Sequence, residues 1–366
     1  MQVLQICHCY YPPFLDCARQ YSKLFHGTDY KVLTIYLTGD PNLDVARATC
    51  SDEVIFLGYK SSQVSGLKLN AISRVREIVA KGDFKFCITH RAKPTYVALL
   101  ATSLPVISVH HNYGDFKRFS RRLLVNFFRN RLLLLGVSDS VRDEMRVDLP
   151  KWPHERIETL YNRIDVNATQ TNFLSKIEAR EALGLPESAW VIGNVGRLHY
   201  DKDQVTLMRG FKAALPSLPA NSMLVIMGSG SLETELKQLA RSLDISQRVI
   251  FTGQIIDGKR YFKAFDVFTL TSDHEPFGMV LLEAMAADIP IICSDCGGGA
   301  EVVKDAGELF PFGDAHALAI CLIRVYERNN NLDSSRIAKK LNENFSDEAV
   351  RDRFWRIPFV MGLTES

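Results

Sequence analysis

The 366-residue sequence has no uninterrupted apolar run of the roughly 18 residues that a membrane-spanning helix needs. No basic residue precedes the apolar residues of the first 13 positions, which argues against a signal peptide. We therefore expect a cytoplasmic protein whose eight cysteines are reduced thiols. The group Cys7-His8-Cys9 lies at the end of an apolar strand-like run, and Cys293-x-x-Cys296 has no matching Cys or His pair at zinc-finger spacing. We interpret these cysteines as buried inert thiols and expect no metal.

The sequence also lacks an excess of either charge. Lysine plus arginine is 44 and aspartate plus glutamate is 42, giving a net charge of +2. This balance does not favour nucleic acid as a partner. With 46% hydrophobic and 23% charged residues, the composition excludes a disordered chain, a collagen and a disulfide scaffold. The length suits two domains.

Short apolar runs alternate with stretches of helical periodicity along the whole chain. Near-continuous apolar strands separated by helices are typical of parallel sheets covered on both faces, so the pattern predicts an α/β protein with two doubly wound Rossmann-like domains. The predicted strands of the first half are 3–7, 32–37, 54–58, 84–89, 106–110, 132–137 and 157–161. Those of the second half are 191–195, 223–227, 249–252, 267–271 and 289–293.

Strand character is lost between residues 162 and 187, and we place a linker near 165–175. The predicted domains are 1–168 and 169–345. Residues 346–366 indicate a helix with an apolar end and no accompanying strand, so we expect this segment to cross back onto the first domain.

Four loops of the second half are expected at the carboxyl ends of strands, where open parallel sheets bind ligands. Gly196, Arg197 and Lys202 follow the first strand, and the two cations suit a diphosphate, although solvated surface charges would look the same. Gly228 and Gly230 would let a phosphate or base approach the backbone, or serve a tight turn. Three glycines at 297–299 allow the same two interpretations.

The remaining loop, which follows the predicted strand 267–271, carries the first of two glutamates that lie eight residues apart. Glu275 lies in the loop, and Pro276 suits the first turn of a helix. Glu283 then falls among apolar neighbours on that helix, where an unpaired carboxylate would be costly. A ribose diol and a buried Arg or Lys are equally good partners for it.

The string Glu275-Pro-Phe-Gly278 with Glu283, preceded by Gly196-Arg197-Leu198 and Lys202, resembles the retaining GT-B glycosyltransferases of family 4, the group 1 glycosyltransferases. Landmarks of the first half occur in the family's order, including the strand 106–110. The resemblance implies the GT-B fold, with two Rossmann-like domains, a cleft between them and a nucleotide-diphospho-sugar bound mainly by the second. The donor is expected to be of the UDP type, with no further cofactor and no metal.

The resemblance also implies roles for individual residues. Arg197 and Lys202 would neutralise the leaving diphosphate, Glu275 would contact the donor sugar, and Glu283 would hold the ribose hydroxyls. Amides near Phe277 and Gly278 would add hydrogen-bond donors. His110 matches the family's strand-end histidine that faces the donor sugar, with His111 as the alternative if the register shifts by one. The sequence departs from the family at Asp16-Cys17, where paired glycines are usual.

A basic segment follows His110 and contains no acid between residues 116 and 131. Apolar residues are interleaved with its cations, which predicts an amphipathic helix for an anionic membrane surface, or an anionic acceptor. The cations assigned to this role are Lys117, Arg118, Arg121 and Arg122.

Taken together, the sequence predicts a retaining, metal-independent hexosyltransferase on the inner face of the plasma membrane. Its acceptor would be a saccharide or a lipid-linked hydroxyl in lipopolysaccharide or other cell-surface glycan synthesis. The alternatives are a sugar-nucleotide epimerase or phosphorylase on the same fold, and a non-catalytic protein that binds nucleotide-sugars.

Overall fold

The structure is a computed structural model that describes residues 1–11, 13–328 and 334–364. The chain forms two compact units, one of residues 1–162 with 350–366 and one of residues 163–349. The sequence placed these boundaries at 168 and 345. Arg163 and Ile164 already belong to unit 2, because Arg163 Nε lies 2.9 Å from Asp347 Oδ1 and Ile164 N donates to Phe345 O (2.9 Å).

Unit 1 contains a seven-stranded sheet in the order β3-β2-β1-β4-β5-β6-β7, paired in parallel throughout the described residues. The predicted strands are confirmed to within two residues at each end. They are β1 (Gln2–Cys7), β2 (Lys31–Thr38), β3 (Glu53–Tyr59), β4 (Phe84–His90), β5 (Val106–His110), β6 (Leu132–Gly136) and β7 (Ile157–Thr159).

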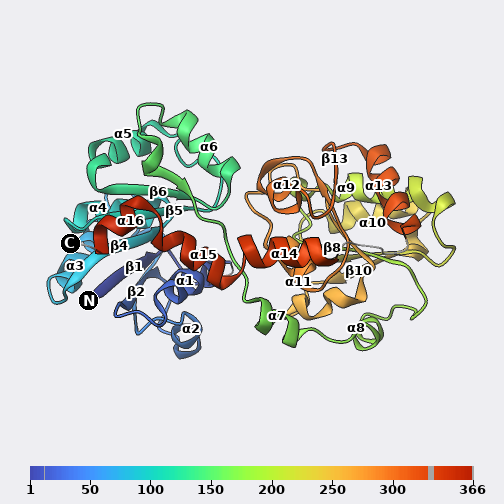
Figure 1. Cartoon of the computed structure of the whole chain (residues 1–366), viewed down its shortest axis with the longest axis horizontal. Helices are drawn as coiled ribbons and strands as arrows, with labels where there is room; N and C mark the ends of the chain where they lie inside the picture. The colour runs from blue at the N-terminus through green and yellow to red at the C-terminus, as the bar shows by residue number, and fades with distance from the viewer. Residues whose placement is uncertain (12, 329–333, 365–366) are drawn as a thin grey trace. The chain divides into compact units, whose positions relative to one another are not determined.

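The helices that follow these strands in Figure 1 are α1 (Phe14–Ser22), α2 (Leu43–Ala48), α3 (Leu69–Val79), α4 (Ala92–Ala101), α5 (Phe119–Phe127) and α6 (Asp139–Asp148). The end of the chain returns to this unit from residue 350 onward, within α15 (Asp347–Trp355), and continues as α16 (Pro358–Thr364); both helices are red in Figure 1. Phe354 is fully buried with its ring 5.8 Å from that of Phe25, and Trp355 Nε1 donates to Leu24 O (3.3 Å). The predicted crossing back is therefore confirmed.

Unit 2 contains a six-stranded parallel sheet in the order β10-β9-β8-β11-β12-β13. Its strands are β8 (Val191–Val195), β9 (Met223–Met227), β10 (Val249–Gly253), β11 (Val267–Leu270), β12 (Ile291–Ser294) and β13 (Glu308–Phe310). The last of these was not predicted, because three residues are too few to show a pattern. The helices are α7 (Val166–Asn172), α8 (Lys176–Ala182), α9 (Gln204–Ala214), α10 (Glu233–Ser242), α11 (Met279–Ala286), α12 (Gly297–Val303), α13 (Ala315–Glu327) and α14 (Ser334–Asn344).

The predicted linker at 165–175 is wrong, because this segment is mostly helical and belongs to unit 2. Asp165 starts α7 by accepting a hydrogen bond from Ala168 N (3.0 Å), and Ser175 with Glu178 forms a capping box at the start of α8. Polar residues at these positions therefore begin helices.

A chain of hydrogen bonds crosses the core of unit 1 from β1 to the start of α1. Gln5 Nε2 donates to Ala18 O (3.1 Å), which leaves Gln5 Oε1 to accept from His90 Nε2 (3.2 Å). The remaining acceptor of neutral His90, Nδ1, then takes a hydrogen from His111 Nε2 (3.1 Å). His111 Nδ1 in turn accepts from the Cys17 thiol (3.6 Å).

Burial keeps the titratable side chains of this series of hydrogen bonds uncharged. It lowers the pKa of His90 from 6.5 to about 3, with the charge of Arg91 adding to the effect, and lowers that of His111 well below its usual value. Burial also raises the pKa of the Cys17 thiol to about 12. The donor and the acceptor of each of these hydrogen bonds are thus fixed at neutral pH.

The depressed pKa of His90 predicts a loss of stability in acid. Below the unfolded-state pKa of 6.5 the unfolded chain binds a proton that folded His90 does not, so unit 1 should lose about 2 kcal/mol between pH 7.5 and pH 5. His90→Gln should remove this contribution to the pH dependence. Urea unfolding in a Trp190→Phe background measures it, because the remaining Trp152 and Trp355 both lie in unit 1. Equal pH dependence with and without His90 would contradict the assignment.

Candidate functional site

The carboxyl edge of the second sheet gathers the loops that follow β8, β9, β11 and β12. Strand β8 lies between β9 and β11, so the chain leaves β8 toward one side of the sheet and returns to it from the other. Such a reversal of strand order opens a crevice at the carboxyl ends of the strands, which is where doubly wound sheets bind ligands. The sequence-predicted residues of unit 2 lie in these loops.

An ion pair joins the loops after β8 and β11. Lys202 Nζ lies 2.5 Å from Glu275 Oε2, and their side chains are only 18% and 14% exposed. Thr271 Oγ1 donates to Lys202 O (2.8 Å), and Gly298 N donates to Glu275 O (2.8 Å). Both charged residues are thereby held by the ends of three neighbouring strands, β8, β11 and β12.

Arg197 lies in the same loop as Lys202 but is held differently. Its side chain is 72% exposed, and Nη2 lies 3.2 Å from Asp201 Oδ2. Asp201 Oδ1 also lies 2.6 Å from His199 Nδ1. An exposed ion pair of this kind contributes little to stability, so Arg197 can turn toward an anion at small cost.

The glycines of this edge are explained by packing of the chain against itself. A Cβ on Gly228 would lie 1.9 Å from Gly196 O, and one on Gly230 would lie 2.3 Å from Leu198 O. Gly196 N donates to Met227 O (2.9 Å), which brings the loops that follow β8 and β9 together. The space left by the missing side chains is filled by backbone, so it does not supply the predicted approach of a phosphate or base to these glycines.

The start of α11 differs from the prediction in two respects. The helix begins at Met279 after Gly278, whose φ of 88° suits glycine, so Pro276 lies before the helix and not in its first turn. Glu283 is partly exposed, whereas the sequence predicted a buried carboxylate. Phe277 is 2% exposed and packs on Phe345, so only its backbone can reach a ligand.

In unit 1, the two histidines at the end of β5 occupy different environments: His110 is the last residue of the strand, and His111 follows it. His110 is 1% exposed; its Nε2 contacts Ser108 Oγ (3.0 Å) and its Nδ1 contacts Asp115 Oδ2 (2.7 Å). Burial alone would raise the pKa of Asp115, but the hydrogen bond from His110 and the charges around it lower it. Both ring nitrogens of His110 are therefore used inside the unit, and so are those of His111, which contact His90 and Cys17. His111 differs in being partly exposed, which favours the alternative register.

His111 lies against the Asp16-Cys17 segment that replaces the family's paired glycines. Cys17 Sγ is 3.6 Å from His111 Nδ1, while Asp16 Oδ1 is 2.5 Å from Arg19 Nη2. Asp16 is thus neutralised within α1. Sequence reasoning missed the link between Cys17 and His111, since the two residues are 94 positions apart.

The absence of acids between residues 116 and 131 suggested that the cations of this segment have no counter-charges, which is wrong for two of them. Arg121 Nη1 lies 2.8 Å from Asp115 Oδ1, and Lys117 Nζ lies 3.4 Å from Glu144 Oε1. Both acids lie outside the window of 116–131. Arg118 and Arg122 have no ionic partner among the described residues. No helix in the described part of the chain is both long and apolar enough to cross a membrane.

The helix α5 carries an unexpected apolar stripe. Phe119, Leu123 and Phe127 follow one another at four-residue spacing and are 71%, 60% and 81% exposed. Residues four apart lie on one face of a helix, so these three form a continuous exposed surface beside Arg118 and Arg122.

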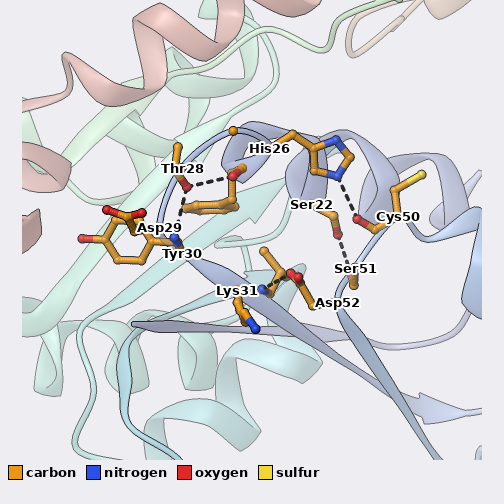
Figure 2. A pocket seen from close by; sticks show the side chains of 12 residues that line it. Ser22, His26, Thr28, Asp29, Tyr30, Lys31, Cys50, Ser51 and Asp52 are labelled. Atoms are coloured by element: carbon orange, nitrogen blue, oxygen red, sulfur yellow. Dashed lines mark hydrogen bonds between the residues drawn. The ribbon is translucent and has the colours of Figure 1, made fainter.

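A cavity of about 700 Å³ lies at the opposite edge of the first sheet, around the amino end of β2 (Figure 2). Its polar groups bond to one another: Ser22 Oγ to Ser51 Oγ (2.7 Å), His26 Nε2 to Cys50 O (3.1 Å) and Asp52 Oδ2 to Val32 N (2.8 Å). This cavity does not include the sequence-predicted residues. Among the described residues, no three His, Cys, Asp or Glu side chains are grouped to hold a metal ion.

Comparison with known proteins identifies relatives of this sequence. Residues 175–349 match the family model of the group 1 glycosyl transferases. The chain is 32% identical to a putative glycosyltransferase, EpsF of Bacillus subtilis, over 67% of each protein. It is 30% identical to the lipopolysaccharide core biosynthesis glycosyltransferase LpsE of Rhizobium meliloti, covering 64% of this chain and 66% of LpsE. It is 26% identical to the N-acetyl-alpha-D-glucosaminyl L-malate synthase of Bacillus anthracis, over 82% and 81%.

The fold also agrees with solved structures. HepE of Anabaena in complex with UDP superposes over the full length of both chains with a TM-score of 0.82 at 19% identity. This likeness and the two parallel α/β units establish the GT-B fold that the sequence predicted. Because the match to EpsF covers two thirds of both proteins and the family model covers residues 175–349 of unit 2, the chain belongs to the group 1 glycosyltransferases.

Proposed function

We propose that this glycosyltransferase moves a sugar from a nucleotide-diphospho-sugar to a hydroxyl of a saccharide or lipid-linked acceptor. The observation that carries the proposal is the Lys202–Glu275 pair at the carboxyl edge of the second sheet, with Arg197 exposed in the same loop. HepE, of the same fold, binds UDP, which supports a UDP-type donor. The relation to LpsE supports a role in lipopolysaccharide or other cell-surface glycan synthesis.

The chemistry required of unit 2 is the stabilisation of a leaving diphosphate. Arg197 and Lys202 would supply positive charge where negative charge develops, which is where fixed charges accelerate a reaction most. Glu275 would hold Lys202 in place and contact the donor sugar. The amides of Phe277 and Gly278 would add hydrogen bonds, and Glu283 would bind the ribose hydroxyls.

The acceptor hydroxyl is the nucleophile in this proposal, and the configuration of the transferred sugar is retained. His111, rather than His110, is the histidine that we assign to the donor sugar, because His111 is partly exposed and His110 is only 1% exposed. No organic cofactor takes part.

Replacing Arg197 and Lys202 by alanine should weaken UDP binding by about ten- to a hundredfold for each side chain, because each makes a charge-assisted contact. Isothermal calorimetry measures the affinity. The matched control is Arg209→Ala with Lys212→Ala, which removes two exposed cations from α9 of the same unit. Unchanged affinity in a folded double variant would refute the diphosphate assignment.

Transfer should survive exhaustive chelation, since the two cations take the part that a divalent ion plays at the leaving group in other transferases. The measurement is release of UDP from the donor with and without EDTA. Activity that disappears with EDTA and returns with magnesium or manganese would show that the leaving group is stabilised differently.

We further propose that α5 binds the inner face of the plasma membrane, so that the protein is cytoplasmic and peripheral. Its apolar stripe can enter the headgroup region while the neighbouring arginines meet anionic lipid. Because Arg121 and Lys117 have acidic partners within the unit, the attraction rests mainly on Arg118 and Arg122, at about 1 kcal/mol each.

Changing Arg118 and Arg122 to glutamine should reduce partitioning onto phosphatidylglycerol vesicles by roughly thirtyfold. Changing Phe119, Leu123 and Phe127 to serine should abolish it, and UDP affinity should stay the same in both variants. Co-sedimentation measures binding, with Ile177→Ser and Ile256→Ser as the control for loss of exposed apolar residues, which are 61% and 94% exposed in unit 2. Equal binding of both α5 variants and the wild type would exclude this helix.

A further inference from the structure

Basic side chains also gather at the carboxyl edge of the first sheet, on segments other than α5. Arg91 directly follows β4, and Lys93 lies in the first turn of α4. His8 directly follows β1, which pairs with β4. Lys68, at the start of α3, places its Nζ 4.3 Å from the ring centre of Tyr96 on α4. Tyr96 is one turn from Lys93 on the same helix, so the two lysines flank one surface.

These cations are not balanced by acids. None of Arg91, Lys93 and Lys68 has an ionic partner among residues 1–11, 13–328 and 334–364. The nearby carboxylates form their ion pairs with other residues, Asp115 with His110 and Arg121 and Asp16 with Arg19. Against the effect of burial, the charge of Arg91 also helps to lower the pKa of Asp115, after the effects of His110 and Arg121. Burial lowers the pKa of His8, and the charges of Lys93 and Arg91 lower it further.

Two polar atoms of this group are enclosed without a hydrogen-bond partner in the described structure. They are His8 Nδ1 and Arg91 Nε. The rest of the Arg91 guanidinium is held in place: Cζ lies 4.5 Å from the ring centre of Phe14, and Nη2 donates to the Asn112 side-chain oxygen (2.6 Å) when that amide is oriented to satisfy its neighbours. A buried donor that lacks a partner is unfavourable unless a ligand supplies one.

The backbone of Arg91 is strained in a way that serves this arrangement. Its φ of 71° and ψ of 172° fall in a region that is almost confined to glycine. This conformation allows Arg91 N to donate to Val109 O (2.8 Å) while α4 begins at the next residue. No side chain caps the helix, so the N–H groups of Ala92 and Lys93 face the same edge, where they favour an anion.

We propose that the carboxyl edge of the first sheet binds an oxyanion of the acceptor, a phosphate or a carboxylate, through Arg91, Lys93 and His8. This inference rests on the proposed function, because it specifies the chemistry of the acceptor substrate. The oxyanion would lie against the N-terminus of α4, with Arg91 Nε as one of its donors. Lys68 would add positive charge at longer range.

The strand order explains why this edge suits the acceptor. Strand β1 lies between β2 and β4, so the ends of β1 and β4 flank the reversal of strand order in unit 1, just as β8 and β11 do in unit 2. The malate synthase that this chain resembles acts on a dicarboxylate by its name, which supports an anionic acceptor here. The proposal stands on this chain's own cations.

The test is calorimetric titration of the whole protein with inorganic phosphate, L-malate and glycerol in the presence of saturating UDP. UDP occupies the diphosphate site of unit 2, so any binding that remains reports on another site. We expect phosphate or malate to bind and glycerol not to bind. Binding of phosphate alone would indicate a phosphorylated acceptor, and binding of malate alone a carboxylate-bearing one.

The decisive variant is Arg91→Gly with Lys93→Ala. Glycine accepts the backbone conformation of Arg91, so the variant should fold, and its oxyanion affinity should fall at least tenfold with UDP affinity unchanged. The control is Lys81→Ala with Lys151→Ala, which removes two exposed lysines from the same unit. Equal loss in both double variants, no loss in the first, or binding of neither anion by the wild type would overturn the proposal.

Failure of the donor assignment can be told apart from failure of this one. If the wild-type protein does not bind UDP, the same titrations are made in the Arg197→Ala, Lys202→Ala background, where the cations of unit 2 are absent. Oxyanion binding there that depends on Arg91 and Lys93 would support the site in unit 1 even though the proposed donor had failed.

Discussion

Parallel pairing of the strands is the constraint on which the candidate site depends. A parallel pair cannot be joined by a tight turn, so each strand of both sheets is followed by a crossover that usually contains a helix. All strands of a sheet then end at the same edge, and residues far apart in the sequence meet there. Lys202 and Glu275 are 73 positions apart and form an ion pair because β8 and β11 are neighbours.

The two sheet edges balance their charges differently. In unit 2, the cation Lys202 is matched by the acid Glu275, which lies 2.5 Å away. A matched pair keeps a charged group in place without a ligand, at the cost of removing both partners from water. In unit 1, Arg91 is fixed by an aromatic ring and an amide, neither of which carries charge. Arg91 therefore has no ion-pair partner among the described residues of unit 1.

The sequence was sufficient for the strands because burial on both faces leaves a continuous apolar run, which needs no knowledge of partners. It was also sufficient to place Arg197, Lys202 and Glu275 at strand ends. It was insufficient where a neighbour distant in the chain decides the outcome. The acids that neutralise Arg121 and Lys117 lie outside the basic segment 116–131. The backbone that excludes a side chain at Gly228 belongs to the loop after β8, which precedes it in the chain.

The sequence also does not show which of two adjacent residues occupies a given environment. His110 and His111 are equivalent in a pattern of apolar residues, yet His110 is the last residue of β5 and His111 lies just beyond the strand. The ring of His110 contacts Ser108 and Asp115, whereas that of His111 contacts His90 and Cys17. Only the positions of the surrounding helices distinguish them. The same holds for Pro276, whose preference for a first helical turn is overridden by the positive φ of Gly278 two residues later.

The return of α15 and α16 to unit 1 has a consequence for the order in which the protein is made. During synthesis, the seven strands of the first sheet emerge from the ribosome long before residues 350–364, because unit 2 is synthesised in between. Until then Phe25 lacks the aromatic surface of Phe354 and Trp355. A domain normally folds as it emerges, N-terminal part first. Here the first domain to emerge is the last to be completed, so the nascent chain carries an unfinished apolar surface throughout the synthesis of the second.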